Sequence, residues 1–310
     1  MEPEIFDVII IGGGPSGLSA AIYTVRKNLT VLIITKNVGG EAVLSNSIEN
    51  YLGFTLITGA DLAGKFREDV TRFEGKGLWL KEGVQALELS GTFPNFQVKA
   101  SDGNIYKSKT VIIASGRNPR MLGIPGEKEF LGKGVSVCAT CDGPLYLDKE
   151  VVVVGRGNSA LDTAATLIKV AKSVTLVNNT ADVKGDEILL QNIKNAPNAK
   201  MINNSEAVEI LGEQFVTGIR IKDQSSSHEE TIPSQAVFVE IGWTPAVEFD
   251  KITRKNDQNE IMVDGAGASS ETGIWAAGDV NDQWGDQIII AAGKGAKTAL
   301  AVAKFLSKTN

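Results

Sequence analysis

Two stretches of the chain share one pattern of apolar residues and glycines. The first has four apolar residues at 8–11, glycines at 12–14 and 17, and then an apolar helical stretch. The second has four valines at 151–154, glycines at 155 and 157, and then apolar residues at helical spacing up to Ile168. Continuous β-branched runs are typical of strands covered on both faces, as in parallel sheets. The repeat therefore predicts two strand–turn–helix units, each the start of a Rossmann-like domain.

The other elements follow from shorter patterns. Helices are predicted over 60–73 and 187–193, with a long closing helix over 287–306. A hairpin is predicted from the segments 84–99 and 105–113, with a turn at Asp102-Gly103. The remaining predicted strands are 31–34, 110–114, 174–177, 216–221, 236–240 and 273–277.

The order of these elements predicts the domain organisation. We expect an α/β fold with two three-layer Rossmann-like domains, the second inserted into the first. The first domain would comprise residues 1–116 and 243–310, and the second would comprise 117–242. A length of 310 residues agrees with about two domains.

Composition and charge exclude several classes of protein. The formal net charge is −6 and no basic stripe is present, which argues against nucleic-acid binding. No apolar run approaches the roughly 18 residues of a membrane span, so we expect no membrane partner. The acidic start of the chain is unlike a secretory signal, and we expect a cytoplasmic protein.

The only two cysteines, Cys138 and Cys141, are three residues apart. In a reducing cytoplasm such a pair is typically redox-active or metal-binding. The single histidine, His228, lies in a polar run far from the pair, so no metal site is expected. Asp142 provides a titratable acid beside the cysteines. The alternative is two buried apolar cysteines followed by a solvated aspartate.

Each strand–turn–helix unit carries a nucleotide-binding fingerprint. Gly12, Gly14 and Gly17 follow a strand and open a helix, which suits a pyrophosphate at the helix N-terminus. The second strand of this unit ends at Thr35-Lys36, without the acidic residue that usually binds an adenosine ribose. Gly278-Asp279 follows another apolar strand, and its carboxylate would accept hydrogen bonds from a polyol; alternatively, it is a turn or helix-cap aspartate.

The second fingerprint is Gly155, Gly157 and Ala160. The next strand of this unit ends at Asn178-Asn179, where neither arginines for an NADP phosphate nor an acidic residue for NAD is present. Asn178 is expected to bond ribose hydroxyls, which favours NADH over NADPH. The alternative is a site that no longer binds nicotinamide.

Eight motifs in fixed order extend over most of the chain. They are GGGPSG at 12–17, GG at 39–40, IENYLG at 48–53, ASG at 114–116, LGIPGE at 122–127, GVSVCATCDG at 134–143, GRGNSA at 155–160 and AAGD at 276–279. In this order the chain resembles the low-molecular-weight thioredoxin reductases and the reductase portion of the alkyl hydroperoxide reductase flavoprotein.

The resemblance implies an FAD domain and an inserted nicotinamide domain with a redox disulfide, in a homodimer. In that family a hydride passes from nicotinamide to FAD, the flavin reduces the cysteine pair, and the dithiol reduces thioredoxin or a thioredoxin-like or glutaredoxin-like protein. Cys141 would face the flavin, Cys138 would attack the partner's disulfide, and Asp142 would be the acid–base residue.

The resemblance also implies two sets of cofactor-binding residues. The FAD set is Gly12, Gly14, Pro15, Ser16, Gly17, Lys36, Gly39, Gly40, Glu41, Asn50, Val84, Ala114, Gly116, Gly278, Asp279, Gln287 and Ile288. The NAD(P) set is Gly155, Gly157, Asn158, Ser159, Ala160 and Asn178.

The chain departs from the family pattern at several positions. The usual His-Arg-Arg cluster is missing from 178–186, and the run 181–189 resembles the hydroperoxide reductase flavoprotein, whose nucleotide is NADH. We expect an equivalent of that flavoprotein's N-terminal thioredoxin-like portion to be a separate chain. Glu41 replaces a glutamine and Asp286 a basic residue. Both are expected to place negative charge near the flavin and shift its potential.

We therefore expect an FAD-dependent thioredoxin-disulfide reductase that prefers NADH. One alternative takes electrons from ferredoxin instead of a nicotinamide. Another is a flavin dithiol oxidase, which passes electrons from small thiols to oxygen. A third is a flavin-binding protein without catalytic activity.

Overall fold

A computed structural model describes residues 2–45 and 48–309 of the chain. The described residues divide into two compact units. Unit 1 comprises those within 1–44, 48–118 and 244–310, and unit 2 comprises residue 45 and 119–243. The chain passes from unit 1 to unit 2 along β7 (Arg117–Pro119) and returns along β16 (Trp243–Pro245), and these two short strands pair with each other.

Unit 1 is built on a seven-stranded sheet with the order β3-β2-β1-β6-β5-β4, and β17 pairs with the end of β6. Its parallel strands are β1 (Ile5–Ile11), β2 (Val31–Thr35), β3 (Leu78–Glu82), β6 (Ile105–Ile113) and β17 (Ile274–Ala276). The antiparallel strands are β4 (Ala86–Thr92) and β5 (Asn95–Ala100). Its helices are α1 (Pro15–Val25), η1 (Gly40–Leu44), α2 (Gly59–Thr71) and α6 (Ile288–Thr309).

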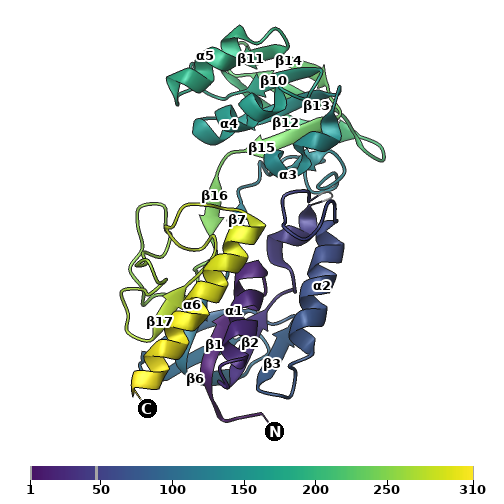
Figure 1. Cartoon of the computed structure of the whole chain (residues 1–310). Helices are drawn as coiled ribbons and strands as arrows, with labels where there is room; N and C mark the ends of the chain where they lie inside the picture. Colours follow the sequence, from purple (N-terminus) through teal and green to yellow (C-terminus); the bar gives the residue numbers. More distant parts are fainter. Residues whose placement is uncertain (1, 46–47, 310) are drawn as a thin grey trace. The chain divides into compact units, whose positions relative to one another are not determined.

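Alternation along β1 explains why the sheet of unit 1 is covered on both faces. Successive side chains of a strand point to opposite faces. Ile9 and Ile11 pack into one apolar cluster, and Val8 and Ile10 pack into a second one with α1 and α6. Figure 1 shows α1 and α6 lying next to each other in this second layer.

Unit 2 has a five-stranded parallel sheet with the order β11-β10-β9-β15-β8. These strands are β8 (Val135–Ser136), β9 (Glu150–Gly155), β10 (Ser173–Val177), β11 (Ala199–Ile202) and β15 (Ala236–Glu240). An antiparallel sheet joins β12 (Ser205–Gly212), β13 (Val216–Asp223) and β14 (Glu229–Pro233). The helices are α3 (Ala139–Asp142), η2 (Gly143–Tyr146), α4 (Asn158–Leu167) and α5 (Glu187–Asn195).

The four valines of β9 show the three layers of unit 2. Val151 and Val153 pack with α4 and α5, whereas Val152 and Val154 pack with the antiparallel sheet. The predicted α/β class with two Rossmann-like domains is confirmed. No helix among residues 2–45 and 48–309 is long and apolar enough to cross a membrane.

Several strands differ from the sequence prediction. The segment 84–99 is two strands, β4 and β5, and 105–113 and 110–114 belong to the single strand β6. Strands β3, β7, β8, β11, β12, β14 and β16 were not predicted. β14 has the sequence Glu-Glu-Thr-Ile-Pro and is mostly exposed, so it has no apolar alternation, and its pairing with β13 creates the strand.

Candidate functional site

The first glycine turn leaves open space beside the N-terminus of α1. Gly12 has a φ of +116°, and a Cβ there would lie 2.2 Å from the backbone oxygen of Ala114. A Cβ at Gly17 would lie 2.0 Å from the oxygen of Gly12, so this glycine lets α1 pack against the turn. At Gly14 a Cβ would meet no atom within 4 Å. A phosphate therefore has room at the free N–H groups of the helix start.

Other predicted FAD residues of unit 1 lie beside this turn or follow the strands of the same sheet. Gly39 donates its backbone N–H to Gly13, and a Cβ at Gly40 would lie 3.1 Å from the Cα of Gly14. The residues that follow the carboxyl ends of β1, β2, β3, β6 and β17 are, respectively, Gly12, Lys36, Val84, Ala114 with Gly116, and Gly278 with Asp279. This end of a parallel sheet is where open α/β folds bind ligands.

Asp279 lies in the turn after β17, and it is the clearest orphaned acceptor in this region. Its Oδ1 atom is buried without a hydrogen-bond partner among the described residues, as is the hydroxyl of Ser16 at the start of α1. Gly278 packs against Ser16, since a Cβ at Gly278 would lie 2.9 Å from the Cβ of Ser16. Burial and the nearby charge of Asp286 raise the pKa of Asp279 to about 6. An acceptor of this kind fits a hydroxyl donor from a bound polyol.

Asp286, which the sequence analysis expects to add negative charge near the flavin, is paired with an arginine. Its carboxylate lies 2.8 Å from the Nη1 atom of Arg117, and no local sequence pattern indicated this pair. Glu41 lies in η1, and partial removal from water raises the pKa of its carboxyl. Glu41 therefore carries its charge less readily than an ordinary glutamate.

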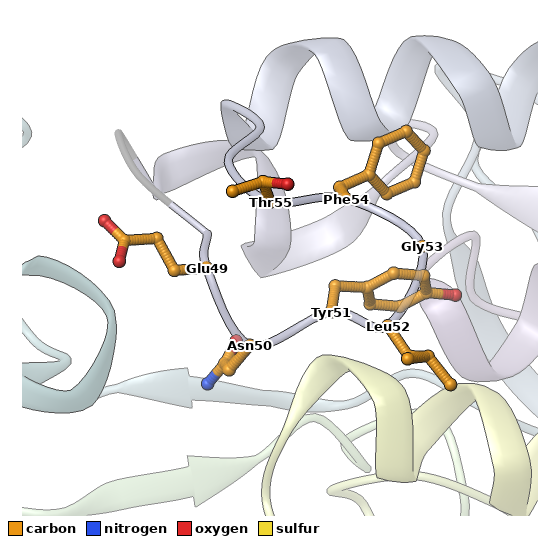
Figure 2. Close-up of a pocket in the computed structure, with 7 residues that line it drawn as sticks. All are labelled: Glu49, Asn50, Tyr51, Leu52, Gly53, Phe54 and Thr55. Carbon is orange, nitrogen blue, oxygen red and sulfur yellow. The ribbon is translucent and has the colours of Figure 1, made fainter.

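The loop after η1 forms a pocket of about 440 Å³ in unit 1. Figure 2 shows the seven residues that line it, from Glu49 to Thr55, with Tyr51 and Leu52 on the same stretch of loop. The side chain of Asn50 donates to Gln287 Oε1 over 3.1 Å. This bond ties the predicted FAD residue Asn50 to Gln287, which immediately precedes α6, and Ile288 is the first residue of that helix.

The second glycine turn, in unit 2, has a similar construction. Gly157 has a φ of +78°, and a Cβ at Gly155 would lie 2.2 Å from the backbone oxygen of Glu240 in β15. Asn158 and Ser159 are exposed at the start of α4, and Ala160 is buried beneath them. The Asn158 side chain accepts a hydrogen bond from the Asp186 backbone over 2.8 Å, which fixes the loop before α5 beside the turn.

Asn178 is placed differently from the sequence expectation. The side chain is buried, and its Nδ2 donates to the Thr180 oxygen and to Asn203. Its Oδ1 accepts from the Thr180 backbone and hydroxyl. Asn178 therefore shapes the loop after β10, and its contacts do not support the expectation that it bonds a ribose.

Cys138 and Cys141 form a disulfide at the start of the short helix α3. Asp142 follows the pair and is buried. The hydroxyl of Ser136 accepts from the Cys138 backbone N–H over 3.1 Å and donates to Asp142 Oδ2 over 2.7 Å. Ser136 thus connects the disulfide backbone to the carboxylate, a role that its position two residues before Cys138 did not reveal.

The negative charge of Asp142, beside the disulfide, affects the pKa of Tyr146 in η2. Burial and the negative charge of Asp142 raise the pKa of the Tyr146 phenol to about 12. Its ring packs edge-on against Phe238 of β15, with the centroids 5.6 Å apart. The Tyr146 phenol therefore stays protonated at neutral pH.

Comparison with known proteins places this arrangement in context. Residues 6–295 match the model of a family described as pyridine nucleotide-disulphide oxidoreductase. The chain is 37% identical over 306 residues to the NADH dehydrogenase of Bacillus subtilis, covering 98% of this chain and 59% of that protein. It is 37% identical over 298 residues to the F component of alkyl hydroperoxide reductase in Staphylococcus aureus, covering 96% and 58% respectively. The chain thus spans less than two thirds of the length of these curated relatives.

Solved structures match over nearly the whole chain. Thioredoxin reductase from Streptococcus pyogenes superposes with a TM-score of 0.90 at 32% identity, covering 98% of this chain and 99% of that one. Thioredoxin reductase from Giardia duodenalis has a TM-score of 0.88 at 28% identity, covering 98% and 100%. The two units are therefore both present in proteins of known structure.

Proposed function

The chain belongs to the pyridine nucleotide-disulphide oxidoreductase family, and on that premise we propose that it is an NADH-preferring, FAD-dependent reductase of protein disulfides. Its substrate would be thioredoxin or a thioredoxin-like or glutaredoxin-like protein. The observation that carries the proposal is the Cys138–Cys141 disulfide beside the buried carboxylate of Asp142. The likeness to thioredoxin reductases and to the F component of alkyl hydroperoxide reductase supports it.

We assign FAD to unit 1. When bound, FAD accepts a hydride from the nicotinamide and passes the electron pair on to a disulfide. The turn at 12–17 would hold the pyrophosphate through backbone N–H groups, and Gly14 leaves space for it. Asp279 would accept a ribityl hydroxyl with its Oδ1, which has no hydrogen-bond partner among the described residues.

The cysteines carry the electrons onward in a balanced exchange. Two electrons and two protons open the Cys138–Cys141 bond to a dithiol. The Cys138 thiolate then attacks the partner's disulfide to form a mixed disulfide. The Cys141 thiolate attacks the Cys138 sulfur of this mixed disulfide and releases the partner. The partner leaves with two thiols, and the Cys138–Cys141 bond is restored. Asp142, held by Ser136, exchanges the protons at the cysteine sulfurs.

We propose NADH rather than NADPH because the loop 178–186 offers no arginine to a 2′-phosphate. Asp182 and Asp186 are exposed there. The Asp186 carboxylate accepts from the backbone of Ile188 and Leu189 at the start of α5. These negative charges repel a phosphate. The similarity to a protein named NADH dehydrogenase points the same way.

The deciding experiment is anaerobic mixing of the flavin-loaded protein with NADH or NADPH while the visible flavin absorbance is followed. We expect rapid bleaching by NADH at low concentration and much slower bleaching by NADPH. Equal rates with both would contradict the nucleotide preference. Bleaching only by reduced ferredoxin would replace the proposal with the ferredoxin-linked alternative, and oxygen uptake driven by small dithiols would replace it with the oxidase.

Single cysteine variants test the second half of the reaction. Cys138→Ser and Cys141→Ser should retain flavin and its bleaching by NADH but lose reduction of a thioredoxin disulfide. Unimpaired thioredoxin reduction in either variant would sink the proposal. A wild-type protein that binds FAD but accepts electrons from no donor would indicate a non-catalytic flavoprotein.

The family resemblance also leads us to propose a cytoplasmic homodimer. Sedimentation of the flavin-loaded protein tests the dimer directly, and a monomer at micromolar concentration would contradict it.

A further inference from the structure

Three charged side chains from separate parts of unit 1 meet beside Asp279. Arg117 comes from β7, Asp286 from the segment before α6, and Lys294 from within α6. The Arg117 guanidinium reaches Asp286 with Nη1 over 2.8 Å, and its Nε lies 4.0 Å from Asp279 Oδ2. One arginine is thus placed between two carboxylates that are seven residues apart.

Lys294 fixes the segment that carries Asp286. It is buried, with 8% of its surface exposed. Its ammonium donates to the backbone oxygen of Gln283 over 2.6 Å and to that of Gly285 over 3.5 Å. These bonds hold the backbone of Gln283 and Gly285 against α6 and so fix the segment immediately before Asp286.

The two oxygens of Asp279 have different surroundings. Oδ2 faces the guanidinium, whereas Oδ1 is buried and has no hydrogen-bond partner among the described residues. An acceptor left in this state calls for a donor that the chain itself does not provide. The proposed ribityl hydroxyl is such a donor, and a charged carboxylate accepts it more strongly than a neutral acid.

We propose that Arg117 is a positioning residue of the flavin site: held by Asp286, its guanidinium keeps Asp279 charged, with one oxygen turned toward the ribityl chain. The inference rests on the proposed function and adds Arg117, Asp286 and Lys294 to it.

The electrostatics of the cluster agree with this arrangement. Burial and Asp286 raise the pKa of Asp279, whereas Arg117 and Lys294 lower it. Neutralising Arg117 should therefore move the pKa of Asp279 upward, and neutralising Asp286 should move it downward. Damage to the fold alone would weaken flavin binding without producing opposite shifts.

The test is FAD titration of the flavin-free full chain between pH 5 and pH 9, for wild type, Arg117→Met, Arg117→Lys and Asp286→Asn. FAD should bind more tightly as pH rises through the titration of Asp279. We expect Arg117→Met to bind about tenfold more weakly at pH 7 and to move the midpoint of this pH dependence upward. Arg117→Lys should recover most of the affinity, and Asp286→Asn should move the midpoint downward.

Arg72→Met is the matched control. Arg72 also pairs with an aspartate, Asp69, over 3.7 Å, and this pair is exposed at the end of α2. The FAD affinity of Arg72→Met and the midpoint of its pH dependence should equal those of wild type. Circular dichroism checks the fold of each variant, and Arg117→Lys and Asp286→Asn keep the test decisive if Arg117→Met does not fold.

Two results overturn the inference in distinguishable ways. If wild type binds FAD but the substitutions leave the midpoint unchanged, or shift it in one common direction, Arg117 does not act on Asp279 and the proposed function still stands. If wild type binds no FAD at any pH, the proposed function and the inference both fail.

Discussion

A single residue, Asp279, makes the stability of the fold depend on pH. Its pKa is raised from an ordinary value of 3.8 to about 6, chiefly by burial. Between these values the folded chain binds more protons than the unfolded chain, so stability falls as pH rises through this window. The contribution is present below pH 3.8 and is lost above about pH 6. The flavin-free protein therefore carries a charge at neutral pH that opposes folding.

Asp279→Asn removes this opposing charge. We expect the flavin-free variant to be more stable than wild type at pH 7, by up to about 3 kcal/mol, and to bind FAD more weakly. Urea unfolding at pH 7 and at pH 4 measures the effect, with the low-pH experiment as internal control because the difference should shrink there. A variant less stable than wild type at pH 7 would contradict the interpretation.

Ser136→Ala tests the hydrogen bond to Asp142. Hydrogen bonds to charged groups contribute about 1.5–3 kcal/mol, so turnover with a thioredoxin disulfide should fall about tenfold or more. Flavin reduction by NADH should stay unchanged, because that step precedes the disulfide. Stopped-flow and steady-state assays separate the two steps.

Ser234→Ala is the matched control for Ser136→Ala. Ser234 is also buried in unit 2, but its hydroxyl has no hydrogen-bond partner among the described residues. Its replacement should leave both steps of the reaction unchanged and should not destabilise the protein. Equal losses in the two variants would show that the Ser136 effect is one of packing.

Individual residues of the site were predictable to different degrees. The glycine turns were visible because the spacing of Gly12, Gly14 and Gly17 is a local pattern. Arg117 and Lys294 were not visible, because their partners lie far away in the sequence or are backbone oxygens. The roles assigned to the predicted cofactor residues remain predictions.

At the scale of the elements, the packing of α1 against α6 depends on the close approach of the two backbones at Gly295. A Cβ at Gly295 in α6 would lie 2.0 Å from the backbone oxygen of Ser16 in α1. A backbone atom cannot move aside as a flexible side chain can, so the two helices pack closely only because this position is glycine. Gly293, on the same helix, would place its Cβ in open space.

Gly295→Ala and Gly293→Ala should therefore have opposite effects. Gly295→Ala should destabilise unit 1 by about 2 kcal/mol or more, as overpacked core substitutions do. Gly293→Ala should be neutral or stabilising by up to about 1 kcal/mol, because alanine favours helix over glycine. Thermal unfolding of the two variants side by side checks this. Similar melting temperatures for both would refute the close-approach argument.

Elements with strong periodicity were predictable, whereas several edge strands were not. The runs at 8–11 and 151–154 form the central strands β1 and β9, since strands covered on both faces require continuous apolar residues. Strands β3 and β11 lie at sheet edges. An edge strand has a neighbour on one side only and can contain fewer apolar residues. Its own sequence pattern is therefore weak, and it is recognised by its pairing with the neighbouring strand.

At the scale of the whole molecule, two separate pairs of apolar clusters stabilise the two units. The repeated strand–glycine–helix pattern was enough to predict the confirmed fold class, because each repeat begins its own parallel sheet. It carried no information on the antiparallel sheet of unit 2, whose strands pair through their backbone and have mixed polar and apolar residues.

Each nucleotide should therefore stabilise its own unit. FAD at about one hundred times its dissociation constant should raise the unfolding temperature of unit 1 by roughly 5–10 °C, and NADH should act on unit 2. Differential scanning calorimetry with each ligand measures the shifts. Gly14→Ala, which places a methyl group in the open space of the first turn, should abolish the FAD shift and leave the NADH shift. Loss of both shifts would show that the sites are not independent.

Because unit 2 is inserted between β7 and β16, its sequence is synthesised before the last part of unit 1. Strand β17 and helix α6 come from the last part of the described chain, yet they complete the sheet and the helical layer begun by β1 and α1. Unit 2 is contiguous from 119 to 243 and has its own core. It can therefore fold on the ribosome before the last strand of unit 1 has been synthesised. Asp279 and Lys294 are synthesised later still, so the proposed flavin site would be completed only late in the maturation of the newly made chain.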